Sequence, residues 1–373
     1  MNVAIMTTAL SPNYGAALQT YALSRAILDL NIDVDVYSYN DKRRLTDGMN
    51  LLSKVKYYLW NTSKIFLFGG KKEKAFKVFR NENIPMTEKT YRCNQELCDD
   101  PGEYDVYIAG SDQIWNPDFF RYDMSYFLNF VPEGKKKISY ASSFAKRVFS
   151  SPYYDECSKL LSDFDAISVR EHSGINIVKE LCGKEAVQVL DPTLLLNRNE
   201  WAMITENSSL RAKQFSGILC YIMPGDKAVT NAIEKNAQMI HKLTGLPIMR
   251  LGIKEYNWKK YKAEEVDLFA SPTDFVTYFL NAQYVVTNSF HGTAFGINFG
   301  KQTIIPYNSQ LKKEKAIHER IFSLLEELES FELLIPNEQI INELPIQNVD
   351  KTSKLLQKER EKSILFLKSA LIG

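Results

Sequence analysis

The chain has 373 residues, which is long for one hydrophobic core and enough for two domains. Its formal net charge of +1 provides no global field that would favour nucleic acid as a partner. The five cysteines are irregularly spaced and form no CxxC pair, so we expect free thiols in a reducing compartment and no zinc site.

Strand and helix signals alternate along almost the whole chain. The apolar patterns first predict strands at residues 2–10, 34–39, 105–110, 137–142, 165–170 and 185–190, and helices at 15–30 and 172–181. After Pro192 they predict strands at 217–223, 247–251 and 302–307, another strand that ends at Val286, and helices at 228–243, 293–299 and 349–371. Ser271 is a good N-cap for one more helix, with Pro272 at the first helical position.

This alternation is typical of parallel sheets that are covered by helices on both faces. Two such blocks meet near residue 192, so the predicted fold class is α/β, with two Rossmann-like, doubly wound domains that face a cleft. We expect an N-terminal domain at residues 1–192, a C-terminal domain at 193–345, and a C-terminal helix at 346–373 that returns to the N-terminal domain.

The start of the chain bears on localisation. The segment MNVAIMTTALSPNYG has no basic residues before its short apolar run, so we expect a first strand there and no signal peptide. No window approaches 18 uninterrupted apolar residues, so no membrane-spanning helix is expected. The protein is therefore expected to be cytoplasmic.

Residues 54–80, KVKYYLWNTSKIFLFGGKKEKAFKVFR, mix lysines with aromatic side chains. One interpretation is a basic amphipathic helix that rests on the anionic headgroups of the inner membrane surface. The alternative is a helix that faces the core and keeps its lysines in water.

The turn into the first predicted helix is one candidate site. Asn13, Tyr14 and Gly15 lie where a helix offers its N–H groups and the positive end of its dipole to an anion or a sugar hydroxyl. A tight turn that merely needs Gly15 is the alternative. The stretch is not GxGxxG, so the dinucleotide fingerprint is absent.

The loop IAGSDQIWNP at residues 108–117 is a second candidate, because binding residues collect on loops that a rigid scaffold holds. Ser111, Asp112 and Gln113 follow the end of a predicted strand, and Trp115 comes two residues later. The Trp115 ring would offer an apolar face to a sugar, with Asp112 and Gln113 bonding its hydroxyls. A self-capped loop around a buried tryptophan is the alternative.

Arg170, at the end of the strand predicted in ISVREH, is a third candidate. A planar guanidinium there suits bidentate contact with phosphate or carboxylate. The alternative is a surface pair between Arg170 and Glu171.

The stretch VVTNSFHGTAFGINFGK, residues 285–301, contains one of only four histidines. His291 lies between a predicted strand and a predicted helix that starts at Thr293, where the ligand crevice of a β-α-β unit lies. A histidine titrates near neutral pH, so it can accept or donate a proton. A neutral histidine that caps a helix or bonds a buried carbonyl is the alternative.

Together, NYGAALQTYAL, GSDQIWN, the SVRE turn, the DPT triplet and NSFHGTAFGINFGK resemble the polysaccharide pyruvyl transferase family, in the family's order and over about residues 1–325. The resemblance implies two Rossmann-like domains in a GT-B-like arrangement. It also implies transfer of a pyruvyl group from phosphoenolpyruvate to a sugar, with formation of a ketal, release of phosphate, and no cofactor.

The resemblance assigns roles to residues of this chain. His291 is implied as the catalytic residue and Arg170 as a donor-binding residue. Beside the resemblance, the helix start at Ser289 and Gly292 would offer N–H groups to the donor, so both are expected to bind it. A downstream basic residue also binds the donor in some members, and its candidates here are Lys301, Lys312, Lys313 and Lys315. The main donor site then lies in the C-terminal domain. The residues expected to bind the acceptor are those of the two candidate turns in the N-terminal domain, namely Asn13, Tyr14, Gly15, Ser111, Asp112, Gln113 and Trp115. The chain has Ser289 where several members have an arginine.

The predicted function is thus a pyruvyl transferase that acts on a sugar of a capsular or exopolysaccharide precursor. A lipid-linked acceptor would explain why residues 54–80 combine lysines with aromatic side chains. Two alternatives stay open: a GT-B glycosyltransferase that uses a nucleotide sugar, and a non-catalytic relative that binds sugar or phosphate. Turnover with release of inorganic phosphate separates the last from the enzymes.

Overall fold

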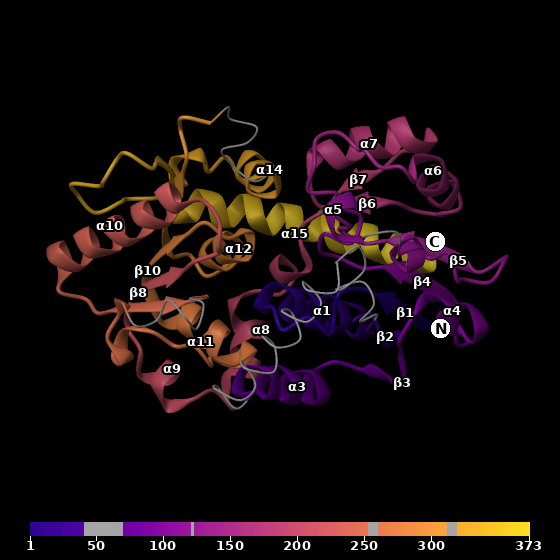
Figure 1. Cartoon of the computed structure of the whole chain (residues 1–373), viewed down its shortest axis with the longest axis horizontal. Helices are drawn as coiled ribbons and strands as arrows, with labels where there is room; N and C mark the ends of the chain where they lie inside the picture. Colours follow the sequence, from indigo (N-terminus) through magenta and orange to yellow (C-terminus); the bar gives the residue numbers. More distant parts are fainter. Residues whose placement is uncertain (41–69, 121–122, 253–259, 312–318) are drawn as a thin grey trace, which may run out of the picture. The chain divides into compact units, whose positions relative to one another are not determined.

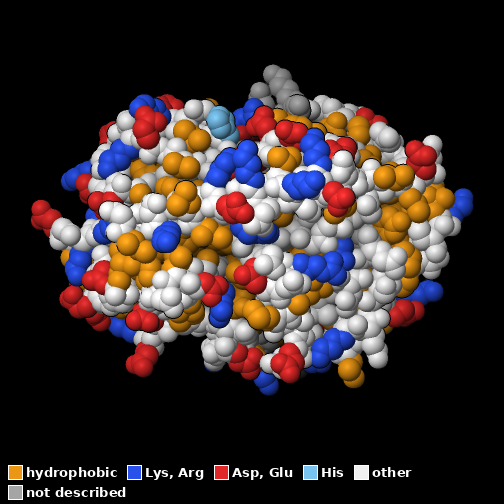
Figure 2. Space-filling model, turned by 180° about the vertical axis from the view of Figure 1, so that it is seen from behind, with side chains coloured by type: hydrophobic (Ala, Val, Ile, Leu, Met, Phe, Trp, Pro, Cys, Tyr) orange, Lys and Arg blue, Asp and Glu red, His pale blue; other side chains and the backbone are white. Residues whose placement is uncertain are grey.

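The structure is a computed structural model that describes residues 1–40, 70–120, 123–252, 260–311 and 319–373 (Figure 1). The chain forms two compact units. Unit 1 contains Met1–Val169, Gly174–Gln188 and Leu367–Gly373, and unit 2 contains Arg170–Ser173 and Val189–Phe366. Acidic and basic side chains are interspersed over the face that Figure 2 shows, in keeping with a net charge of +1.

Unit 1 is built on a parallel sheet of five strands in the order β3-β2-β1-β4-β5. The strands are β1 (Asn2–Met6), β2 (Asp33–Tyr39), β3 (Met86–Tyr91), β4 (Val106–Ala109) and β5 (Lys136–Ser139), and β6 (Ser168–Val169) and β7 (Val187–Gln188) form a separate parallel pair. The helices are α1 (Tyr14–Leu28), α3 (Lys71–Asn83), α4 (Asn94–Asp99), α5 (Pro117–Phe120), the 3-10 helix η2 (Met124–Phe127), α6 (Tyr154–Ser162) and most of α7 (His172–Cys182). The strand order reverses direction between β1 and β4.

The centre of this sheet is tightly packed. Strand β1 is buried over Val3–Met6, as expected of the middle strand of a sheet with both faces covered. Gly110 follows β4, and a Cβ at that position would lie 2.9 Å from Cγ2 of Ile5. Glycine therefore lets the loop after β4 run close beside β1.

Unit 2 is built on a second parallel sheet, in the order β12-β11-β10-β8-β9. The strands are β8 (Gly217–Tyr221), β9 (Ile248–Leu251), β10 (Ala282–Thr287), β11 (Gln302–Tyr307) and β12 (Leu334–Pro336). The helices are η3 (Pro192–Leu194), α8 (Arg198–Ala202), η4 (Met203–Thr205), α9 (Leu210–Gln214), α10 (Lys227–Thr244), η6 (Ala263–Glu265), α11 (Pro272–Asn281), α12 (Phe290–Asn298), α14 (Glu319–Glu327), η7 (Phe331–Leu333) and α15 (Val349–Ile372), whose last turn belongs to unit 1. The order is that of flavodoxin-like sheets, and it reverses between β8 and β10.

Some elements differ from their predicted extent. The strands expected at 165–170 and 185–190 shrink to the two-residue strands β6 and β7. Helix α12 begins at Phe290, three residues before its predicted start, because Ser289 acts as the N-cap. His291 therefore lies inside the first turn of the helix.

The basic, aromatic stretch at 54–80 falls partly outside the described residues. Within α3, Phe76 and Phe79 are buried and the lysines lie toward solvent. This part of the stretch is therefore a helix that faces the core and keeps its lysines in water, which was the alternative to a membrane-bound helix. No helix in the described part of the chain combines the length and apolar character needed to cross a bilayer. Contact of residues 54–69 with a membrane stays a prediction.

Candidate functional site

The reversal of strand order in unit 2 marks the edge where ligands of such sheets bind. Asn288 follows β10 there and ties it to the segment after β8. Its Oδ1 accepts a hydrogen bond from the backbone N of Met223 at 2.8 Å, and its Nδ2 donates to the Met223 carbonyl at 3.0 Å. Sequence reasoning did not single out Asn288 as a site residue, although an asparagine directly after a buried strand was a usable signal.

The start of α12 is fixed by short-range contacts. Ser289 Oγ accepts a hydrogen bond from Gly292 N at 3.4 Å, and Ser289 N donates to Thr287 Oγ1 at 3.0 Å. A Cβ on Gly292 would lie 2.3 Å from Thr287 Oγ1, so only glycine lets the helix approach the end of β10 this closely. Ser289 and Gly292 thus hold His291 in position, and their contact with a donor stays a prediction.

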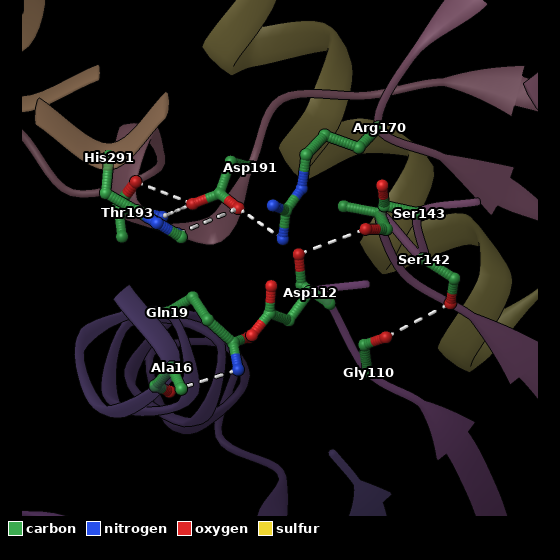
Figure 3. Close-up of polar contacts among 12 residues, drawn as sticks. Ala16, Gln19, Gly110, Asp112, Ser142, Ser143, Arg170, Asp191, Thr193 and His291 are labelled. Carbon is green, nitrogen blue, oxygen red and sulfur yellow. Dashed lines mark hydrogen bonds and ion pairs between the residues drawn. The ribbon is translucent and has the colours of Figure 1, made fainter. Parts of the chain in front are cut away.

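Arg170 and His291 converge on one buried carboxylate, that of Asp191 (Figure 3). Arg170 Nη2 lies 2.6 Å from Asp191 Oδ2, and His291 Nε2 lies 3.9 Å from the same oxygen. All three residues belong to unit 2, and their exposed fractions are at most 7%. Because Arg170 is buried against Asp191, the alternative of an exposed pair with Glu171 is wrong.

The second oxygen of Asp191 is occupied by Thr193. Asp191 Oδ1 accepts from Thr193 N at 2.9 Å and from Thr193 Oγ1 at 2.6 Å, so Asp191 is also the N-cap of η3. Burial alone would raise the pKa of Asp191, but Arg170, His291 and the Thr193 hydrogen bonds hold it below its usual value. The carboxylate therefore stays ionised and places a negative charge 3.9 Å from His291 Nε2.

Phe290 lines the same cluster from the first turn of α12. Its ring centroid lies 4.9 Å from Cζ of Arg170 and 5.2 Å from the centroid of the His291 ring. A guanidinium over an aromatic face gains a cation–π contact and keeps its planar orientation. Arg170 is thus held both by a carboxylate and by a ring.

The downstream basic residue is not Lys301. Lys301 directly precedes β11, at the sheet edge opposite to the one where His291 follows β10. Its Nζ donates to the Leu280 carbonyl at 2.7 Å, and burial, with Arg198 nearby, lowers its pKa to about 8. The predicted donor contact of Lys301 is therefore wrong, whereas Lys312, Lys313 and Lys315 lie outside the described residues.

Unit 1 has its own polar cluster where its strand order reverses. Thr8, after β1, donates from Oγ1 to Asp112 Oδ2 at 3.0 Å, and Thr7 Oγ1 donates to the Ser111 carbonyl at 2.8 Å. Asp112 has a positive φ of 81°, a conformation that costs energy for a residue other than glycine. Strain of this kind tends to gather at functional sites, and contact of Asp112 with an acceptor stays a prediction.

Of the three residues predicted as a site at the turn into α1, only Asn13 is partly exposed. Asn13 is the N-cap, and its Oδ1 accepts from Ala16 N at 3.2 Å. Tyr14 and Gly15 are buried, and the Tyr14 ring lies 5.1 Å from that of Phe76. Asn13 is the more open of the three, and its contact with an acceptor stays a prediction.

Trp115 does not offer a face to a sugar. It is 0% exposed, its ring stacks on Phe127 at 5.6 Å, and its Nε1 donates to the Tyr126 carbonyl at 3.0 Å. Gln113 accepts from Asn116 Nδ2 at 2.9 Å. The loop is thus self-capped around a core tryptophan, and the predicted acceptor contact of Trp115 is wrong.

Ser111 is buried in the same loop. Its Oγ donates to the Ala141 carbonyl at 3.0 Å. Contacts of Ser111 and Gln113 with an acceptor stay predictions.

The model of the family described as polysaccharide pyruvyl transferase matches residues 13–309, most of the chain. The chain belongs to this family. Membership makes the chain a transferase and confirms the resemblance that its motifs indicated. No curated protein matches the sequence.

Solved structures share the fold at low sequence identity. The UDP-GlcNAc 2-epimerase from Methanocaldococcus jannaschii has a TM-score of 0.54 and 11% identity, with 96% of this chain and 99% of that chain covered. The UDP-N-acetylglucosamine 2-epimerase from Rickettsia bellii has a TM-score of 0.53 and 9% identity, with 99% and 96% covered. These enzymes have the GT-B fold, so the predicted GT-B-like α/β class is confirmed.

Proposed function

We propose that this member of the polysaccharide pyruvyl transferase family transfers a pyruvyl group from phosphoenolpyruvate to two hydroxyls of a sugar in a surface polysaccharide precursor. The observation that carries the proposal is the convergence of Arg170 and His291 on the buried Asp191, at the carboxyl edge of the sheet in unit 2. Phosphoenolpyruvate carries a phosphate and a carboxylate, so a site for it needs guanidinium and N–H donors beside a proton donor. This edge of unit 2 combines those groups.

The proposed reaction needs one proton at carbon and loses two from oxygen. Protonated His291 donates its proton to the C3 methylene of phosphoenolpyruvate, and positive charge develops at C2. One sugar hydroxyl adds to C2 and loses its proton, the bond from C2 to the phosphate oxygen breaks, and the second hydroxyl closes the ketal. Of the two protons released, one restores His291 and the other leaves with inorganic phosphate.

Asp191 is the positioning residue in this proposal. A carboxylate 3.9 Å from the imidazole stabilises the imidazolium that the first step needs. The 2.6 Å contact with Arg170 and the two bonds from Thr193 keep that carboxylate in one orientation. Because Asp191 holds Arg170 in one orientation, we propose that Arg170 meets the donor through its guanidinium group.

We propose that the sugar acceptor binds at the carboxyl edge of the unit 1 sheet. Asn13 and Asp112 support this placement, because both follow strands or open a helix at the point where the strand order reverses. Both side chains are partly exposed, and both carry oxygens that can bond a hydroxyl. They are therefore the better candidates of the predicted set.

The test is the identity of the products. The purified chain is given phosphoenolpyruvate and a panel of sugar precursors, both free and lipid-linked, and phosphate release is followed together with the mass of the acceptor. We expect one phosphate for each acceptor whose mass increases by that of one pyruvic acid less one water. Consumption of a nucleotide sugar with no use of phosphoenolpyruvate would contradict the proposal and favour the glycosyltransferase alternative.

A further inference from the structure

We propose that Arg320, which lies beyond the segment matched by the family model, binds the anionic donor together with Arg170, as two guanidinium groups held on the ring of Phe290. The inference rests on the proposed function, because it names a further donor-binding residue of the same site. It concerns unit 2 alone, to which all three residues belong.

The geometry places both arginines on one ring. Cζ of Arg170 lies 4.9 Å and Cζ of Arg320 lies 5.3 Å from the centroid of Phe290. Phe290 is directly followed by His291, whose ring centroid is 5.2 Å away. Arg320 and His291, the proposed proton donor, therefore lie against the same ring, that of Phe290.

The position of Arg320 is fixed by the packing of α14. Ser323, one turn after Arg320, accepts a hydrogen bond through Oγ from His172 N at 3.2 Å. That bond ties α14 to the turn that carries Arg170. Ile321 and Leu324 pack in one core cluster with Phe290, so the helix is anchored to α12 as well.

The charges of the cluster make a second guanidinium useful. Arg170 pairs with Asp191 at 2.6 Å, so this pair adds little net charge to the site. Glu171, in the same turn, is also buried. A donor with a phosphate and a carboxylate needs more cationic character than Arg170 alone supplies.

Arginine suits this role better than lysine would. A guanidinium presents several N–H donors in one plane, so it can bind two oxygens of an anion at once, whereas an ammonium acts as a point charge. Arg320 is 9% exposed, so its side chain has limited freedom and loses little entropy when an oxyanion binds.

The experiment measures the Kd of phosphoenolpyruvate by calorimetry on the full chain and on Arg320→Met and Arg320→Lys. We expect Arg320→Met to weaken binding roughly ten- to a hundred-fold, the usual effect of losing a charge-assisted contact. Arg320→Lys keeps the charge but not the planar fork, and we expect it to weaken binding several-fold. If the methionine variant does not fold, the lysine variant carries the test.

Arg198→Met is the matched control. Its guanidinium contacts the carbonyls of Phe299 and Leu280, at the amino edge of the sheet, away from Phe290. We expect this variant to bind phosphoenolpyruvate like the wild type. Wild-type affinity in both Arg320 variants would overturn the inference and leave the proposed function intact, whereas a wild-type chain that binds no phosphoenolpyruvate would overturn both.

Discussion

At the scale of single residues, Asp191 is a buried carboxylate with polar neighbours at both of its oxygens. One of its oxygens accepts two hydrogen bonds from Thr193, and the other faces Arg170 and His291. A buried ion pair of this kind is strongly destabilised when only one partner is removed, because the other charge is left without compensation.

We therefore predict that Asp191→Asn lowers the free energy of unfolding by about 3–5 kcal/mol. Urea denaturation at pH 7 measures it, with Asp155→Asn, an exposed position of α6, as the control that changes little. A loss below about 1 kcal/mol would mean that Arg170 does not depend on this carboxylate.

At the scale of elements, the contact between α12 and β10 decides where His291 lies. A methyl group on Gly292 would lie 2.3 Å from Thr287 Oγ1, and that oxygen also donates to the Tyr221 carbonyl at 2.7 Å. The side chain of Thr287 is therefore not free to move aside, and the helix has to shift instead.

We predict that Gly292→Ala destabilises the protein by roughly 1–3 kcal/mol through overpacking and also lowers kcat, since His291 moves with the helix. Thermal denaturation and the phosphate-release assay measure the two effects. Gly225→Ala is the control, because a Cβ there meets no atom within 4 Å. Equal behaviour of the two variants would contradict the packing argument.

The pairing of α14 with α15 contains a second titratable feature. Burial, together with a hydrogen bond to Glu359, raises the pKa of Glu327 to about 7. The folded state thus holds this proton more tightly than the unfolded state does. The stabilisation is complete below the ordinary glutamic acid range and is lost as pH rises through about 7.

We predict that Glu327→Gln reduces the loss of stability between pH 5 and pH 8, because glutamine cannot lose the proton. Urea denaturation at the two pH values measures this, with Glu326→Gln, an exposed neighbour on the same helix, as the control. A variant with the same pH dependence as the wild type would show that another group causes it.

At the scale of the whole molecule, much of the fold was predictable from alternation of apolar runs and turn residues. Strand β3, with the sequence MTEKTY, was not predicted, because an edge strand with exposed polar side chains has little hydrophobic signal. The strands around Ser168 and Val187 were overestimated, since an apolar run does not say how many of its residues pair.

The candidate site was partly predictable for a similar reason. Arg170 and His291 could be found because polar residues at strand ends stand out in sequence. Asp191 was missed because local sequence does not reveal its contact with His291, which lies 100 residues further along the chain. Trp115 was misassigned because burial of a ring cannot be derived from local sequence. Lys301 was misassigned although the predicted order of strand, helix and parallel strand already placed it at the amino edge of the sheet.

The central claim is that His291 moves a proton in a reaction that consumes phosphoenolpyruvate. The most direct measurement is the kcat for phosphate release with a competent acceptor, in the wild type and in His291→Gln, with His241→Gln on the exposed side of α10 as the control. Glutamine can keep a hydrogen bond but cannot shuttle a proton, so we predict that kcat falls roughly 10²–10⁴-fold in His291→Gln and stays unchanged in His241→Gln. Wild-type kcat in His291→Gln would contradict the account and reduce His291 to a structural residue at the start of α12.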